Sequence, residues 1–130
     1  MKYLKYLPAV AAVILGLLFV MSGVVVLFNL MGAPPPPEDT PAAHFFAAFH
    51  PTGYLTFVKI CELVGGILVA IPKTRNLGLL VLGPIIVNIL AFHGFVMDGE
   101  GLFSPPVVLV SALALYLLWS GRQQFARLLR

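Results

Sequence analysis

The chain has 130 residues, of which 60% are hydrophobic and only 10% are charged, whereas soluble domains carry about 25% charged residues. This composition excludes a soluble globular domain, because the polar residues are too few to cover its surface, and it predicts a protein embedded in lipid. The net charge is +3, but the basic residues lie at the edges of apolar stretches and form no continuous cluster. This distribution excludes a nucleic-acid-binding surface. A single cysteine, Cys61, excludes an internal disulfide and a thiolate metal site.

Four apolar stretches approach the length of about 20 residues that a membrane-spanning helix needs. The predicted spans lie at about 8–30, 54–71, 76–96 and 105–119. The first is too long for the apolar core of a signal peptide, which has about 7–15 residues. Short connections favour an antiparallel four-transmembrane-helix bundle, and we expect residues 1–130 to form this single domain.

The segment between the first two spans begins with the consecutive prolines Pro34 to Pro37, which favour an extended chain outside the hydrocarbon. Thr40 then has the character of a helix N-cap, with Pro41 at the first helical position. The aromatic residues that follow fall on one side of about two turns: Phe45, Phe46 and Phe49. We expect a short interfacial helix that covers the outer end of the bundle. The alternative is a disordered loop.

The C-terminal segment 120–130 alternates basic and apolar residues and predicts a basic amphipathic tail, suited to an anionic lipid surface. Basic residues beside the spans are retained in the cytoplasm. If four spans alternate, one side holds Lys2, Lys5, Lys73, Arg75, Arg122, Arg127 and Arg130, and the other holds Glu38, Asp39, Asp98 and Glu100. Both termini are therefore expected to be cytoplasmic.

Glu62 is the only acid inside a predicted span, where a carboxylate costs at least about 2.5 kcal/mol. Lys59 lies one turn earlier, at the i, i+3 spacing that allows an ion pair. Glu62 and Asn88 both lie about eight residues, or roughly 12 Å, from the outer ends of their spans. Depth matching predicts one polar layer in the outer half of the bundle: Ser22, Glu62, Asn88 and, slightly nearer the surface, Ser111, with Lys59 and Asn29 above them.

Two interpretations of this layer stay open. It is either a ligand or proton site reached from outside, with Glu62 as anchor, or a set of interhelical hydrogen bonds that holds the bundle together. His93 is a further candidate ligand-binding residue, although it lies about 140° around the helix from Asn88. His44 and His50 are six residues apart, a poor spacing for a helical metal site. No metal site is expected, and no catalytic motif is present, so an enzyme acting alone is not expected.

Three stretches resemble the DoxX family of small four-helix bacterial membrane proteins: GLLFVMSG from Gly16, CELVGGILVAIPKTRNLGLL from Cys61, and PIIVNILAFHGF from Pro84. The most specific part is the acid with its paired glycines, followed by the basic turn and by Pro84 and Asn88. The resemblance covers nearly the whole chain. It implies a multi-pass protein of the bacterial cytoplasmic (inner) membrane, and the family residues that carry over are Glu62, Gly65, Gly66 and Asn88.

Relatives in that family include the small subunits of thiosulfate:quinone oxidoreductase, components of membrane-associated thiol oxidoreductase complexes, and more distant assembly factors. Three functions are therefore considered. The first is a non-catalytic subunit or binding protein for a small lipophilic, quinone-like ligand held by Glu62 and Asn88. The second is the membrane subunit of a quinone-linked thiol or sulfur oxidoreductase, with a redox partner protein and Glu62 as proton acceptor. The third is a scaffold or assembly factor. A homo-oligomer is compatible with each.

Overall fold

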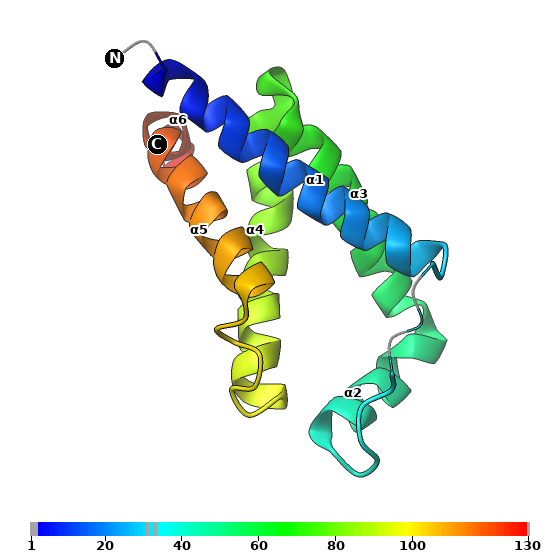
Figure 1. The fold of residues 1–130 in the computed structure, drawn as a ribbon. Helices are drawn as coiled ribbons and strands as arrows, with labels where there is room; N and C mark the ends of the chain where they lie inside the picture. Colours follow the sequence, from blue (N-terminus) through cyan, green and yellow to red (C-terminus); the bar gives the residue numbers. More distant parts are fainter. Residues whose placement is uncertain (1–2, 31, 33, 130) are drawn as a thin grey trace.

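The computed structural model describes residues 3–30, 32 and 34–129, and this part of the chain is helical without β-strands (Figure 1). The predicted all-α class is therefore confirmed for the described residues. Lys2 and Arg130, which contributed to the charge argument, lie outside them. The principal helices are α1 (Leu7–Leu27), α2 (Pro41–Phe49), α3 (Tyr54–Ala70), α4 (Arg75–Ala91), α5 (Pro105–Ser120) and α6 (Arg122–Ala126). The shorter turns are η1 (Leu4–Tyr6), η2 (His50–Thr52), η3 (Pro72–Thr74), the π-helical η4 (Phe92–Val96) and η5 (Arg127–Leu129).

Two helical segments are long and apolar enough to cross a membrane, namely Leu4–Leu27 with 24 residues and Pro72–Val96 with 25 residues. Two more apolar segments qualify only as bent pairs. Pro41–Thr52 and Tyr54–Ala70 meet at 84°, and Pro105–Ser120 and Arg122–Leu129 meet at 72°. The structure thus contains two to four helices able to cross a membrane, which supports the prediction of a membrane protein.

Large apolar side chains are exposed on the outward faces of these helices and on the loop after η4. Phe95 of η4 is 86% exposed, Phe103 in the following loop is 85% exposed, and Leu115 on α5 is 67% exposed. Soluble monomers do not expose apolar surface on this scale. The outward faces are therefore suited to contact with lipid acyl chains, which would shield these side chains from water.

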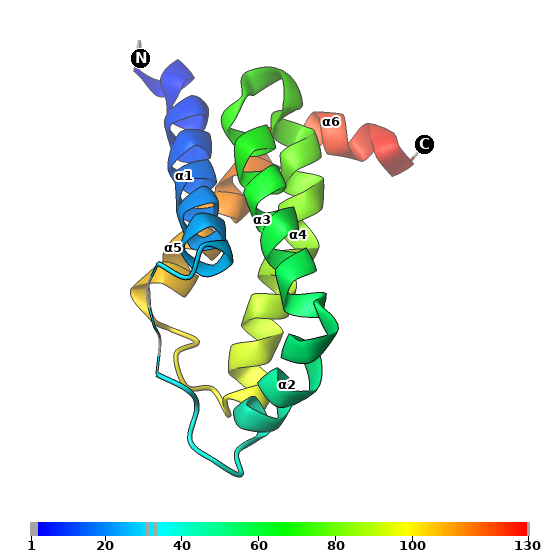
Figure 2. The ribbon, with the colours of Figure 1, turned by 90° about the vertical axis from the view of Figure 1, so that its right-hand side faces the viewer.

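The helices run alternately between two ends of the molecule, as Figures 1 and 2 show for α1, α3, α4 and α5. The start of α1, the turn η3 and the helix α6 lie at one end, which we call the basic end because it carries Lys5, Lys73, Arg75, Arg122 and Arg127. The opposite, acidic end carries α2, the segment before it and the loop after η4, with Glu38, Asp39, Asp98 and Glu100. The predicted separation of charge is thus reproduced in three dimensions for the described residues.

The short helix predicted after the prolines is present as α2. Thr40 caps it, because its Oγ1 accepts a hydrogen bond of 3.2 Å from the amide of Ala43. Its aromatic face packs across the ends of two longer helices: the ring centroids of Phe45 and Phe92 are 5.0 Å apart, and those of Phe49 and Tyr54 are also 5.0 Å apart. The helix α2 therefore bridges α3 and η4 at the acidic end, and the alternative of a disordered loop is not observed. Its position in a membrane interface stays a prediction.

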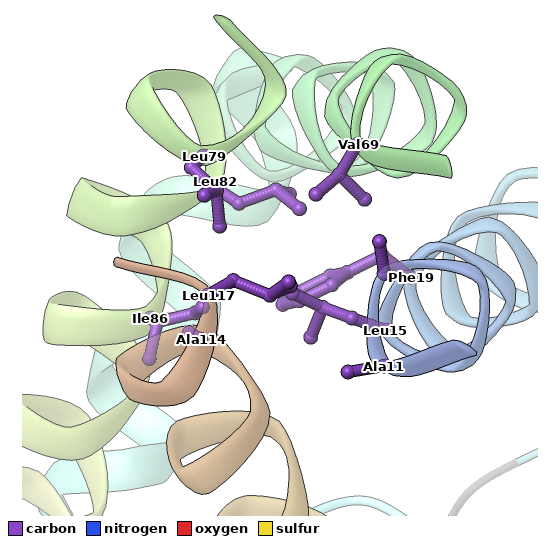
Figure 3. Packing of buried hydrophobic residues seen from close by; sticks show 10 residues of the cluster. Ala11, Leu15, Phe19, Val69, Leu79, Leu82, Ile86, Ala114 and Leu117 are labelled. Carbon is purple, nitrogen blue, oxygen red and sulfur yellow. The ribbon is translucent and has the colours of Figure 1, made fainter. Parts of the chain in front are cut away.

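The apolar core lies nearer the basic end, where side chains from all four long helices meet (Figure 3). Leu15 and Phe19 of α1 face Val69 of α3, with Leu82 of α4 and Leu117 of α5 completing the cluster. Leu15, Val69 and Leu82 are fully buried. Toward the acidic end the buried residues give way to the polar cluster described below and to the aromatic contacts of α2.

Gly78 allows α4 to approach the last turn of α3 closely. A Cβ atom at this position would collide with the backbone nitrogen and Cα of Val69, and backbone cannot rotate away as a side chain can. Gly83, five residues later on the same helix, has no atom within 4 Å of the corresponding position. The two glycines therefore form a matched pair for testing the α3–α4 contact.

Replacing Gly78 by Ala is expected to lower the stability of the protein by about 1–3 kcal/mol, the cost of forcing extra volume into a packed interface. Gly83→Ala is expected to leave stability unchanged or raise it by up to ~1 kcal/mol, because alanine favours the helix. Thermal unfolding of both variants in the same detergent measures the difference. Equal melting temperatures for the two variants would contradict the close α3–α4 approach.

Candidate functional site

The candidate site lies where α1 and α3 cross at short range. A Cβ atom on Gly16 would lie 2.5 Å from the carbonyl oxygen of Gly66, and one on Gly66 would lie 2.8 Å from that of Gly16. Gly23, two turns further along α1, would meet the Cβ atom of Leu63 and the carbonyl oxygen of Lys59 at 3.2 Å. Small residues at these positions allow the two backbones to approach, as in other membrane helix pairs.

This approach brings three polar side chains into mutual contact. The Nζ atom of Lys59 lies 3.0 Å from Oε2 of Glu62, in the ion pair that the i, i+3 spacing predicts. It also donates to Oγ of Ser22 at 3.2 Å, and that hydroxyl donates to Oε2 of Glu62 at 3.4 Å. The Ser22–Lys59–Glu62 cluster therefore joins α1 to α3 by a closed triangle of hydrogen bonds.

The cluster is asymmetric in its access to the surroundings. Glu62 is 4% exposed, whereas the side chain of Lys59 is 25% exposed. An ammonium group has three donors, and two of those on Lys59 are used within the cluster. Both bonds to Glu62 end on Oε2, and Oε1 forms no hydrogen bond to the described residues. One donor and one acceptor thus remain for a small polar group.

The ion pair is also isolated. It is the only salt bridge among residues 3–30, 32 and 34–129, and Glu62 is the only buried charged side chain there. Breaking a buried pair by removing one partner leaves an uncompensated charge, which is much more costly than replacing both partners. The cluster is therefore a strong constraint on how α1 and α3 fit together, whatever else it does.

Asn88 is not part of this cluster, contrary to the polar layer predicted from depth. Its side chain is exposed, and its Nδ2 donates to the carbonyl oxygen of Pro84 at 2.9 Å. A short polar side chain inside a helix can bond the carbonyl oxygen four residues earlier in its own helix, as Asn88 does here. Depth along a helix does not determine the direction around it, and the prediction used depth alone.

Asn29 likewise has a local role that depth matching missed. It adopts a left-handed conformation with φ of 53°, its amide donates to Val26, and the next amide, of Leu30, donates to Val25. These two bonds form the Schellman motif that ends a helix. The left-handed residue of this motif is usually glycine and sometimes asparagine. The position of Asn29 just beyond the apolar run was the sequence signal for this cap.

The remaining polar candidates lie apart from the cluster. Nδ1 of His93 lies 3.1 Å from the carbonyl oxygen of Glu100 and links η4 to the following loop. Oγ of Ser111 is buried without a partner among the described residues. No group of three or more metal-binding side chains gathers in the part of the chain that the structure describes, which includes His44 and His50.

Sequence reasoning missed a second polar contact, at the end of α3. Oγ1 of Thr74 donates to the carbonyl oxygen of Leu68 at 2.7 Å, and Nε of Arg75 donates to that of Val69 at 3.3 Å. A cation at a helix C-terminus also interacts favourably with the helix dipole. A basic residue just after a proline-terminated helix is the signal that could have identified this cap.

Comparison of the chain with models of known protein families, with characterised proteins and with solved structures found no match. The resemblance to the DoxX family is therefore a prediction from the motifs quoted above.

A double-mutant cycle on Lys59 and Glu62 tests the energetic role of the ion pair. Lys59→Met leaves the carboxylate of Glu62 buried and unpaired, and we expect it to destabilise the protein by about 3–5 kcal/mol. The double variant Lys59→Met/Glu62→Leu is expected to recover most of that loss, because no charge is left behind. Thermal unfolding of Lys59→Met, Glu62→Leu and the double variant gives the coupling energy between the two residues. Additive losses would show that the pair is not coupled, and Asn88→Ala, outside the cluster, serves as the near-neutral control.

Proposed function

We propose that this chain is a DoxX-like protein of the bacterial cytoplasmic membrane that binds a small lipophilic, quinone-like ligand at the Ser22–Lys59–Glu62 cluster. It crosses the bilayer four times as an antiparallel bundle of α1, α3, α4 with η4, and α5. The helix α2 covers the outer end of the bundle in the membrane interface. The binding protein is non-catalytic by itself.

The observation that carries this proposal is the buried carboxylate joined to a partly exposed lysine. A membrane protein with a purely structural need at this position could use apolar residues, since replacing a buried ion pair by apolar groups is often neutral or stabilising. Intramembrane ionisable residues mark functional sites more often than structural ones. The retained pair has one donor on Lys59 and one acceptor on Glu62 with no partner among the described residues, which supports a polar contact to a ligand.

The chemistry of the cluster fits a ligand with a carbonyl or hydroxyl group on an apolar ring. The third N–H of Lys59 can donate to a carbonyl oxygen, and Oε1 of Glu62 can accept from a hydroxyl group. These are the groups that a quinone carries in its oxidised and reduced forms. An apolar tail would extend between the outward faces of the helices and the lipid. Asn88, which bonds Pro84, is not required in this arrangement.

Ligand retention tests the proposal directly. The wild-type protein is purified in mild detergent beside Lys59→Gln and Glu62→Gln, and small molecules extracted from each are identified by mass spectrometry. We expect a quinone or similar lipophilic molecule with the wild type and its loss from both variants. Gly78→Ala is the matched control, because it weakens the fold at Val69, two turns along α3 from Glu62 and outside the cluster, and should retain the ligand.

The other two functions considered above correspond to distinct outcomes. If the wild type holds a quinone and a partner protein reduces it with a thiol or sulfur compound, the chain is a subunit of an oxidoreductase. If the wild type holds no small molecule and the variants only melt earlier, the cluster is an interhelical lock. The binding proposal then fails, and a scaffold or assembly role takes its place.

Labelling of single cysteines tests the proposed topology. In a Cys61→Ser background, Glu38→Cys lies at the acidic end and Lys73→Cys at the basic end. In intact cells a membrane-impermeant maleimide is expected to label Glu38→Cys but not Lys73→Cys, because basic loops are retained in the cytoplasm. Lysed cells should show labelling of both. The opposite pattern in intact cells would reverse the orientation, and labelling of both there would contradict the four-span arrangement.

A further inference from the structure

A second feature, away from the Ser22–Lys59–Glu62 cluster, is an apolar groove between α1 and α5. Its volume is about 240 Å³, and it is lined by Leu7, Ala11, Leu109, Ala112, Leu113 and Tyr116. Alanine on both helices leaves space that larger side chains would fill. The first turns of α1 meet the middle of α5 here, and Figure 1 shows the two helices diverging toward the acidic end. The groove therefore opens on the lipid-facing surface and suits a hydrocarbon chain.

Beyond Tyr116, an aromatic and a cationic side chain follow toward the basic end. The ring of Tyr116, which lines the groove, lies 6.3 Å from the ring of Trp119, and the guanidinium of Arg122 lies 4.5 Å above that indole ring. Nη1 of Arg122 also donates to the carbonyl oxygen of Trp119 at 2.8 Å. Two contacts thus hold the guanidinium in place, while Trp119 is 61% exposed and Arg122 is exposed as well.

We propose that this groove binds one acyl chain of an anionic phospholipid whose phosphate is held by Arg122. The lining is almost entirely apolar, and the positive charge of Arg122 lies beyond Tyr116, on the far side of the Trp119 contact. That arrangement matches the division of a phospholipid into tail and phosphate. Guanidinium groups bind phosphate oxygens in a planar, bidentate geometry. One of the five donors of Arg122 is occupied by Trp119, so the exposed remainder is available to the phosphate.

The neighbouring aromatic residues support a position of Arg122 at the level of the lipid headgroups. Tyrosine and tryptophan concentrate where the hydrocarbon meets the headgroups, because their rings are apolar and their polar atoms hydrogen-bond. Tyr116 and Trp119 are three residues apart on α5, so they follow one face of the helix from the groove toward Arg122. A lipid in the groove would place its phosphate beside this pair and its chain along Ala112. This site is independent of the quinone-like ligand proposed at the Ser22–Lys59–Glu62 cluster, because none of the residues that line the groove belongs to that cluster.

Native mass spectrometry of the purified full chain tests the site, with phosphatidylglycerol or phosphatidylcholine added in known amounts. We expect the wild type to retain one phosphatidylglycerol in preference to phosphatidylcholine. Arg122→Gln should lower retention of phosphatidylglycerol about fivefold, the effect of one cation near a lipid headgroup. Ala112→Phe fills the groove and should lower retention of both lipids.

Two matched controls separate a specific site from general attraction. Arg127→Gln removes the same charge from the same end of the molecule, and Leu115→Phe adds volume to an exposed position of α5; both should retain lipid like the wild type. Equal losses for Arg122→Gln and Arg127→Gln would mean diffuse electrostatic attraction and would overturn the assignment of Arg122. Unchanged retention in Ala112→Phe would overturn the groove as the site of the chain.

Discussion

The close crossing of α1 and α3 is the constraint on which the rest of this structure depends. Gly16 and Gly66 oppose each other so tightly that neither can carry a side chain without displacing the backbone of the other. In lipid, helices gain little from apolar association alone, so close van der Waals contact and interhelical hydrogen bonds determine which faces meet. With this pair in place, α4 packs on α3 through Gly78, and α5 completes the core against Leu15 and Phe19.

The polar cluster depends on that crossing and also restricts it. Ser22 reaches Lys59 and Glu62 only because Gly23 lets α1 approach the carbonyl side of Lys59. Conversely, a shift of one helix along the other would leave the buried carboxylate of Glu62 without its hydroxyl partner. That loss would destabilise the shifted arrangement, whereas a leucine at this position would tolerate the shift. The same contacts therefore restrict the helix register, and in the function proposed above they would also anchor a ligand.

Away from this crossing, the helices pack less closely. The contact between α1 and α5 leaves an apolar groove, since the small side chains of Ala11 and Ala112 do not fill it. At the acidic end, α3 and α4 are bridged by the aromatic contacts of α2. The positive φ of 83° at Gly53 allows the chain to turn between η2 and α3. Close backbone contact thus holds the α1–α3 crossing, and aromatic contacts of α2 cover the acidic end.

The sequence by itself determined the helical class, the approximate helix bounds, the cap at Thr40, the Lys59–Glu62 pair and the separation of charge between the ends. All of these depend on local chemistry: apolar length, proline and cap positions, and spacing within one helix. The partners of the polar residues were decided only by the tertiary structure. Ser22 joined the cluster, whereas Asn88 bonded its own helix and Asn29 closed α1. Depth along a span follows from counting residues, but the face a residue presents depends on how each helix is rotated. That rotation is set by contacts such as Gly16 against Gly66, between residues distant in the chain.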